Sequence, residues 1–136
     1  MNSDAEIREI LTGSRVIAVV GASPRPEHDS HDVMRYLQER GYRTIPVNPR
    51  AQDEEILGET VYPSLADVPT AIDLVDIFRN SEAAGNAIDQ AIEVGAKAVW
   101  MQLGVINPSA ASRAERAGLR VVMDRCPKIE IPRLGL

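Results

Sequence analysis

Residues 19–33 contain the strongest indication of a ligand site in this sequence. The stretch reads VVGASPRPEHDSHDV, and its apolar start ends at Gly21, as a buried strand does before a phosphate-binding turn. The second and third glycines of the usual dinucleotide loop are absent, and Pro24 and Pro26 stand where the chain would turn at once into a helix. Ser30 is the expected N-cap of the next helix, so the loop is longer than that tight turn.

The end of the second predicted strand narrows the choice of nucleotide. NAD requires an acidic residue there, about 20 residues beyond the loop, to bind the ribose hydroxyls. This sequence instead has Asn48, Pro49 and Arg50, with no carboxylate. A guanidinium suits a phosphate attached to the ribose. Two candidates remain: NADP, with its 2′-phosphate, and coenzyme A (CoA), with its 3′-phosphate.

The shape of the loop favours CoA over NADP. A wide loop has room to wrap a pyrophosphate whose far side continues into the flexible pantetheine arm. The candidate phosphate contacts are the backbone N–H groups of Ala22 and Ser23, the Ser23 hydroxyl and Arg25. The N-terminus of the helix that begins at Ser30 adds the positive end of its dipole. The alternative is that the two prolines only stiffen a surface loop.

Three similar joints predict an α/β fold with a parallel sheet. The stretches ERGYRTIPV, EVGAKAVWM and RAGLRVVMD each pass from a helix pattern through one glycine, Gly41, Gly95 or Gly118, into an apolar strand. Glycine readily adopts the left-handed conformation that commonly ends a helix. Repeated joints of this kind are typical of βαβ units with right-handed crossovers.

The remaining segments complete a single doubly wound, Rossmann-like sheet with helices on both faces. Further strands are expected in RVIAVVGA, ETVYPSL and IDLVDIF, which gives the expected spatial order 3-2-1-4-5-6. Ligands of such sheets bind beyond the carboxyl ends of the strands, where the order reverses. The predicted site therefore lies beside Gly21 and the end of IDLVDIF. Helix starts are expected at Ser3 with Glu6, at Ser81, and at Asn107 with Pro108.

Six blocks of the sequence resemble the small single-domain CoA-binding proteins. These proteins are similar to the N-terminal CoA-binding domain of the succinyl-CoA synthetase alpha subunit. The blocks are VVGASPRPEHDSHDV, GYRTIPVNPR, ILGETVYPSLADVP, DLVDIFRNSEA, GAKAVWMQLGV and VVMDRC, in this order from about residue 14 to about residue 130. The resemblance implies a Rossmann-like fold that holds CoA at the switch point.

The resemblance also assigns roles to the residues that match the family's motifs. Those expected at the pyrophosphate are Gly21, Ala22, Ser23 and Arg25. Those expected near the adenosine are Asn48, Pro49 and Arg50, and those along the pantetheine path are Phe78, Arg79 and Asn80, with Gln102 and Gly104 beside it. Near the end of the chain, Pro127 and Ile131 replace a leucine and a histidine that are common in the family, so no role is transferred to this tail.

Neither a catalytic residue nor a metal site is predicted. His28 and His31 lie in or just after the loop and are interpreted as loop, ligand-contact or helix-start residues rather than general bases. Ser23 lacks the G-x-S-x-G pattern of a hydrolase nucleophile. Neither HExxH nor a pair of cysteines is present to bind a metal.

Four other residues invite a functional interpretation. Asp73 and Asp76 are three apart on a predicted strand and therefore point to opposite faces, which argues against an acid pair. Trp100 is expected in the core. Cys126, just past the last strand, has two interpretations. It is either a thiol that forms a mixed disulfide with CoA or a small buried hydrophobic residue.

Length, charge and cysteine content exclude several classes of protein. The 136 residues suit one domain, 1–136, with one core. A net charge of -5 gives no general attraction for nucleic acid or for an anionic membrane. The apolar runs are too short to span a bilayer, and the first residues lack a signal-peptide pattern. A single cysteine allows no internal disulfide, which favours a cytoplasmic location.

Two functions remain open from the sequence. The first is a non-catalytic module that binds CoA or acyl-CoA and serves as a sensor, a carrier or the regulatory partner of an acyl-CoA enzyme. No segment matches the second synthetase domain, which bears the phospho-histidine. The second is an NADP-dependent or acyl-CoA-processing enzyme whose catalytic site has no recognisable motif. Equilibrium binding of CoA, acetyl-CoA, NADP and NAD would separate the two.

Overall fold

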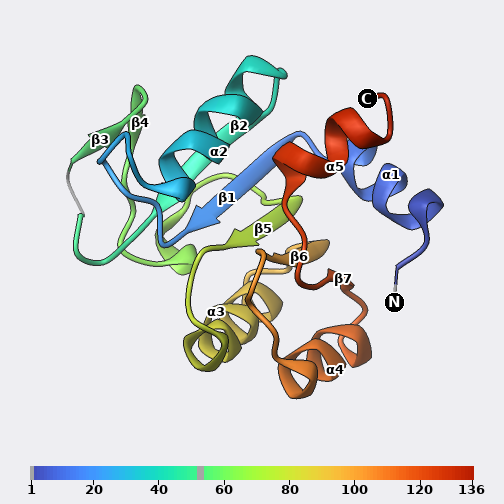
Figure 1. Cartoon of the computed structure of the whole chain (residues 1–136). Helices are drawn as coiled ribbons and strands as arrows, with labels where there is room; N and C mark the ends of the chain where they lie inside the picture. The colour runs from blue at the N-terminus through green and yellow to red at the C-terminus, as the bar shows by residue number, and fades with distance from the viewer. Residues whose placement is uncertain (1, 52–53) are drawn as a thin grey trace.

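The computed structural model describes residues 2–51 and 54–136, and a five-stranded parallel sheet forms its centre. The strands are β1 (Val16–Val20), β2 (Arg43–Val47), β5 (Leu74–Ile77), β6 (Ala98–Met101) and β7 (Arg120–Val122). Their spatial order is β2-β1-β5-β6-β7, and each neighbouring pair is parallel. The predicted Rossmann-like α/β fold is therefore confirmed (Figure 1).

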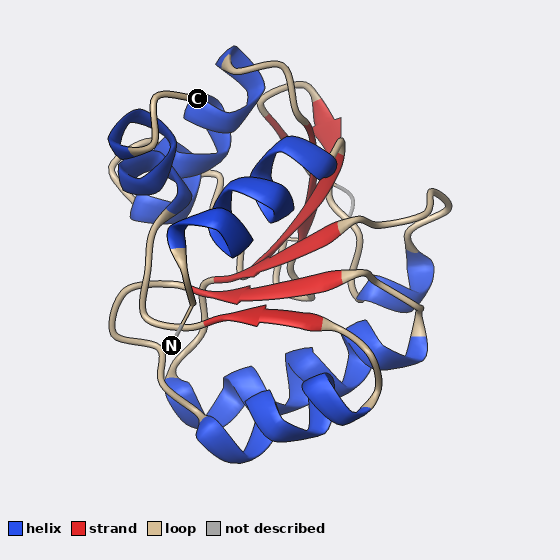
Figure 2. Ribbon diagram, turned by 90° about the vertical axis from the view of Figure 1, so that its right-hand side faces the viewer, coloured by secondary structure: helices blue, strands red, loops and turns tan. Residues whose placement is uncertain are grey.

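Helices cover both faces of the sheet. One face carries α3 (Ser81–Glu93) and α4 (Pro108–Arg116), and the other carries α1 (Asp4–Gly13), α2 (Asp29–Glu39) and α5 (Pro127–Arg133), as Figure 2 shows. The side chains of a strand alternate between the two faces. A strand buried on both sides therefore reads as a continuous apolar run, as VIAVV does in β1.

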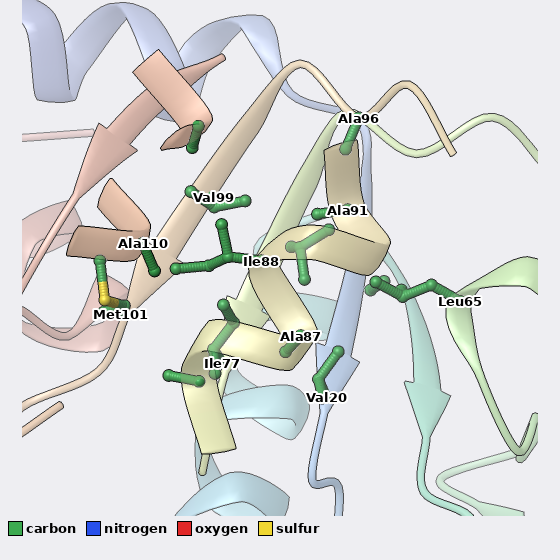
Figure 3. Packing of buried hydrophobic residues seen from close by; sticks show 14 of the residues in the cluster. Val20, Leu65, Ile77, Ala87, Ile88, Ala91, Ala96, Val99, Met101 and Ala110 are labelled. Atoms are coloured by element: carbon green, nitrogen blue, oxygen red, sulfur yellow. The ribbon is translucent and has the colours of Figure 1, made fainter. Parts of the chain in front are cut away.

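Each face of the sheet has its own apolar cluster. In β1, Ala18 and Val20 pack toward α3 and α4, whereas Ile17 and Val19 pack toward α1, α2 and α5. Figure 3 shows Ile88 and other α3 side chains gathered against strand residues on the α3 face. Trp100 lies fully buried in the opposite cluster, which confirms its predicted place in the core.

The expected third strand, ETVYPSL, is not a strand of the main sheet. A small antiparallel hairpin takes its place, formed by β3 (Glu55–Ile56) and β4 (Glu59–Thr60). Leu57 and Gly58 connect the two with φ values of 51° and 82°, the left-handed pair that a tight hairpin turn requires. Tyr62 then makes one isolated parallel bridge to Val47 beside β2. Pro63 follows and has no N–H to continue a ladder.

Most predicted helix ends are confirmed. Gly41, Gly95 and Gly118 all have positive φ where a helix passes into a strand. At the start of α1, Ser3 and Glu6 form the expected capping box. Asn107 caps α4 by accepting a hydrogen bond from the backbone N–H of Ala110, with Pro108 as the first helical residue. No helix among the described residues is long and apolar enough to cross a membrane.

Two predicted caps are wrong by one or two residues. Asn80, not Ser81, caps α3, because its Oδ1 accepts the backbone N–H of Ala83 at 2.8 Å. The Oγ of Ser81 instead accepts the N–H of Ile106 from a neighbouring loop. Likewise, α2 begins at Asp29 with His28 at the N-cap position, so Ser30 is not the cap. The hydroxyl groups of both serines accept hydrogen bonds from other loops, and a helix-capping pattern in the sequence does not reveal such contacts.

Candidate functional site

Gly21 lies at the switch point of the sheet. It follows β1, and Phe78 follows the neighbouring strand β5; the next helices, α2 and α3, cover opposite faces. Gly21 has a φ of 85°, and a Cβ added there would lie 2.2 Å from the carbonyl oxygen of Phe78. The glycine is therefore required by the packing of the chain against itself, before any ligand is considered.

Backbone and side-chain hydrogen bonds fix the Gly21 loop at both ends. The N–H of Gly21 donates to the carbonyl of Val47, and the Nδ2 of Asn48 donates to the carbonyl of Ala22 at 2.9 Å. The N–H of Ser23 donates to the Oγ of Ser30, beyond the far end of the loop, at 3.0 Å. The loop is thus attached to the end of β2 and to the first turn of α2.

One hollow lies beside this loop on the α3 face. We call it the α3-side hollow; its volume is about 290 Å³, and it is lined by Val20, Val47, Pro49, Arg79, Ala83, Asn86, Ala87 and Gln90. Arg79 lies close to the loop, since its Cδ would be 3.5 Å from a Cβ at Gly21. The hollow therefore combines an apolar floor with a guanidinium at the switch point.

A second hollow lies on the opposite face. This α2-side hollow has a volume of about 380 Å³ and is lined by Asp29, Asp32, Val33, Phe78, Gln102, Leu103, Cys126, Lys128 and Ile129. Gln102 is buried, and its Oε1 has no hydrogen-bond partner among the described residues. Phe78 lines the α2-side hollow and the next residue, Arg79, lines the α3-side hollow, so both hollows reach the carboxyl end of β5 from opposite faces.

An ion pair joins the two helices that flank the α2-side hollow. The Nζ of Lys128 in α5 contacts the Oδ2 of Asp32 in α2. Arg35 adds a second contact, 2.7 Å from the other oxygen of Asp32. The hydrogen bond from Lys128, aided by Arg35, lowers the pKa of Asp32 below its ordinary value. Both side chains of the Asp32–Lys128 pair are more than a third exposed, so solvent screens the pair.

Asp76 lies buried behind the site, in the middle of β5. Its register neighbours are Val19 and Trp100, and neither carboxyl oxygen has a hydrogen-bond partner among the described residues. Burial raises the pKa of Asp76 well above its ordinary value, which favours the neutral acid. The carboxylate of Asp73, in contrast, accepts hydrogen bonds from the backbone N–H groups of Arg15 and Val16. The two aspartates do not form an acid pair.

Several predicted site residues line neither hollow. Arg25 is exposed and pairs with Glu27 at 3.0 Å. Arg50 is exposed, and its backbone N–H donates to the Oδ1 of Asn48. The side chain of Asn80 caps α3, and the N–H of Gly104 donates to Asp124. These residues surround the switch point without forming one preassembled cluster.

The two histidines occupy the start of α2. His28 is exposed at the N-cap position, and its Nδ1 lies 2.6 Å from the Oγ of Ser23. That hydroxyl also accepts the backbone N–H of Arg25. Among residues 2–51 and 54–136, no group of three or more His, Cys, Asp and Glu side chains is placed to hold a metal ion.

Comparison with known proteins assigns the chain to a family. The sequence profile described as CoA binding domain matches residues 15–132. This chain belongs to the CoA-binding domain family. "Uncharacterized protein YneT" of Bacillus subtilis (strain 168) is 41% identical over 127 residues, which are 93% of each chain. A solved "hypothetical protein from Pyrococcus horikoshii OT3" is 45% identical with a TM-score of 0.94, covering 99% of this chain and 94% of that one.

The family likeness extends to one part of larger ligases. "Acetate--CoA ligase [ADP-forming] I" of Archaeoglobus fulgidus is 27% identical over 128 residues, covering 87% of this chain but only 18% of the ligase. The resemblance to the small single-domain CoA-binding proteins, inferred from the six sequence blocks, is therefore confirmed, and the related domain of larger enzymes is that of ADP-forming acetate–CoA ligases. The activity of the whole ligase is not thereby transferred to this CoA-binding domain.

Sequence reasoning missed one wall of the α2-side hollow. Helix α5 was not predicted, although Pro127 stands at its first position, as prolines often do in helices. The helix contributes Lys128 and Ile129 to the hollow, and Cys126 immediately precedes it. Leu103, in the loop after β6, was also missed, because an exposed apolar residue in a loop has no distinctive local pattern.

Proposed function

We propose that this CoA-binding domain protein is a non-catalytic, single-domain module for CoA or acyl-CoA, spanning residues 1–136. The observation that carries the proposal is the pair of hollows on opposite faces of the switch point, one lined by Phe78 and the other by the next residue, Arg79. A molecule with a nucleotide at one end and a long flexible arm at the other suits such a site. The family indicates CoA as that ligand.

In this proposal, the pyrophosphate binds at the Gly21 loop, on its Arg79 side. Asp29 and Asp32 occupy the first turn of α2 and disfavour an anion directly over them. Arg79 is half-buried beside Gly21 and supplies a compensating positive charge. The adenosine then extends toward Pro49 and Arg50, and the pantetheine arm passes Phe78 toward Gln102.

Two arginine variants test this orientation. Arg50→Ala is expected to weaken CoA but not dephospho-CoA, since only CoA carries the 3′-phosphate. Hydrogen bonds to charged groups are worth about 1.5–3 kcal/mol, which corresponds to roughly ten- to a hundred-fold in affinity. Arg79→Ala is expected to weaken both ligands equally, because both contain the pyrophosphate. Arg116→Ala, an exposed arginine in the last turn of α4, is the matched control.

The measurement is equilibrium titration of CoA, dephospho-CoA, NADP and NAD against each folded protein. An Arg50→Ala variant that keeps the full preference for CoA would show that another residue reads the 3′-phosphate. Tighter binding of NADP than of CoA would overturn the proposal itself. Native mass spectrometry of protein taken directly from cells would identify the resident ligand independently.

One contact favours the alternative of an acyl-CoA-processing enzyme and has its own test. The Ser23 Oγ and the His28 Nδ1 are 2.6 Å apart, within the distance of a serine–histidine pair. If the contact were catalytic, thiol release from acetyl-CoA would occur and would be lost in His28→Ala. We expect no thiol release from acetyl-CoA above the buffer rate. The contact then serves only to order the Gly21 loop.

A further inference from the structure

Exposed apolar side chains gather at the mouth of the α2-side hollow. Among the described residues, Leu103 and Ile129 are 56% and 50% exposed, yet both line the hollow. They come from different elements, the loop after β6 and helix α5. A single exposed leucine is ordinary on a protein surface. Two large apolar side chains on the lining of one hollow provide a place for an apolar group to leave water.

The interior of the same hollow offers one unsatisfied polar group. Gln102 is 7% exposed, and its buried Oε1 has no partner among the described residues. A buried carbonyl oxygen without a hydrogen bond is unfavourable, so a ligand that donates an N–H there is favoured. The pantetheine arm carries amide N–H groups and ends in sulfur. With an amide at Gln102, whatever is attached to the sulfur lies near the apolar mouth.

The charges of the α2-side hollow restrict what that attached group can be. Asp29 and Asp32 both line the hollow; Asp32 is paired with Lys128 and, from outside the lining, with Arg35, whereas Asp29 has no ion-pair partner among the described residues. The lining therefore carries one excess negative charge. An acyl group that ends in a carboxylate would meet this charge and lose its hydration. A neutral hydrocarbon group meets neither penalty.

We infer that the α2-side hollow is an acyl site, in which Leu103 and Ile129 hold the neutral, apolar acyl group of an acyl-CoA thioester. This inference rests on the proposed function and specifies its ligand class. Burying a methylene group is worth about 0.8 kcal/mol, or about fourfold in affinity. A short acyl group that is partly buried is therefore expected to bind about tenfold more tightly than free CoA.

Butyryl-CoA and succinyl-CoA form a matched pair of probes, because both acyl groups have four carbons and only one ends in a carboxylate. Isothermal titration should show that butyryl-CoA binds about tenfold more tightly than CoA. Succinyl-CoA should bind no more tightly than CoA. Asp29→Asn should narrow the gap between the two thioesters, since it removes the excess negative charge.

Serine variants locate the acyl group. Leu103→Ser and Ile129→Ser should each lower the affinity ratio of butyryl-CoA to CoA toward one. Ile106→Ser is the control, because Ile106 is 49% exposed in the same loop as Leu103 but does not line the hollow. This control should keep the full ratio. Circular dichroism and thermal unfolding confirm that each variant is folded.

The outcomes separate the inference from the proposed function. Equal affinities for CoA and butyryl-CoA in the unmodified protein would overturn the acyl site and leave the CoA module intact. An undiminished ratio in both serine variants would also overturn it, because the acyl group would then lie elsewhere. If neither CoA nor any thioester binds, the proposed function itself fails.

Discussion

The backbone N–H of Ser23 donates a hydrogen bond to the Oγ of Ser30 across 3.0 Å. This bond ties the start of the Gly21 loop to the first turn of α2, so that residues 23–30 form a closed loop. The buried Ser30 hydroxyl thus holds the start of the loop in place, although it does not cap the helix. A ligand that contacts the loop meets a surface already ordered before binding.

Ser30→Ala is expected to loosen this loop. The variant leaves the Ser23 amide without its acceptor, which should lower the free energy of unfolding by about 1 kcal/mol. CoA affinity should fall several-fold, because binding must then order the loop. Urea unfolding and titration calorimetry measure the two effects. Ser109→Ala removes an exposed hydroxyl in α4 and should change neither quantity; equal behaviour of the two variants would contradict the role of Ser30.

Gly21→Ala is expected to damage the fold itself. The new Cβ would lie 2.2 Å from the Phe78 carbonyl oxygen, at a φ of 85° that alanine disfavours. The left-handed conformation alone costs about 1–2 kcal/mol, and the steric overlap adds to it. Gly118→Ala isolates the first cost, since Gly118 has a φ of 91° and a Cβ added there would meet nothing within 4 Å.

Urea unfolding of the two glycine variants should therefore show a clearly larger loss for Gly21→Ala. Equal losses would mean that the chain relaxes around residue 21 at no cost. Any loss of CoA binding in Gly21→Ala must be interpreted alongside its stability. The Phe78 contact means that a larger residue at position 21 disturbs the fold itself as well as any phosphate site.

Asp76→Val is expected to stabilise the protein increasingly as the pH rises. Burial raises the pKa of Asp76, so the folded chain keeps a proton that the unfolded chain releases above about pH 4. The stability of the unmodified protein is therefore reduced as pH rises from there toward the raised pKa. The difference between variant and unmodified protein should grow by up to about 1.4 kcal/mol per pH unit over that range.

Asp73→Asn provides a control with the opposite sign. Burial would raise the pKa of Asp73, but hydrogen bonds from Val16 and Arg15, together with Lys97, hold it below its ordinary value. Its stabilisation is thus complete above about pH 4 and is lost as the pH falls. Urea unfolding at several pH values tests both variants. Parallel curves for Asp76→Val and the unmodified protein would show that Asp76 does not hold its proton on folding.

Cys126 is expected to report occupancy of the α2-side hollow. It is the only cysteine, is 7% exposed and lines the hollow with Gln102 and Phe78. Iodoacetamide should modify it slowly, and saturating CoA should slow the reaction at least several-fold further. Adenosine 3′,5′-bisphosphate, which lacks the pantetheine arm, should give no such protection. Equal protection by both ligands would place the arm outside the hollow.

The sequence predicted the elements whose signals are local. Gly41, Gly95 and Gly118 end helices, as their place between helix and strand patterns indicated, and the apolar runs formed parallel strands. The prediction of a third strand in the main sheet was wrong, because Pro63 interrupts the hydrogen-bond ladder and the segment forms the β3–β4 hairpin instead. The predicted mixed disulfide of Cys126 with CoA stays a prediction, since burial in a hollow is compatible with both of its interpretations.

The site was less predictable because its parts come together only in three dimensions. Ser30 bonds to Ser23, and Ser81 to Ile106, through contacts that a capping pattern does not include. Phe78, Arg79, Pro49 and Gln102 were expected near the ligand and do line the two hollows. Phe78 and Arg79 line opposite faces because the side chains of successive residues at the end of β5 point to opposite sides of the sheet. Helix α5 contributes Lys128 and Ile129 to the site only because it packs against residues that are far away in the sequence.

Because Phe78 and Arg79 line hollows on opposite faces, a ligand that fills both must straddle the edge of the sheet. Such a ligand binds one domain at two places, the α3-side hollow and the α2-side hollow. Once one end is bound, the short connection presents the other at an effective concentration on the order of millimolar. An adenine nucleotide without an arm, or an arm without a nucleotide, loses that advantage. The span of the site then adds selectivity against smaller nucleotides to the preference proposed for Arg50 at the 3′-phosphate.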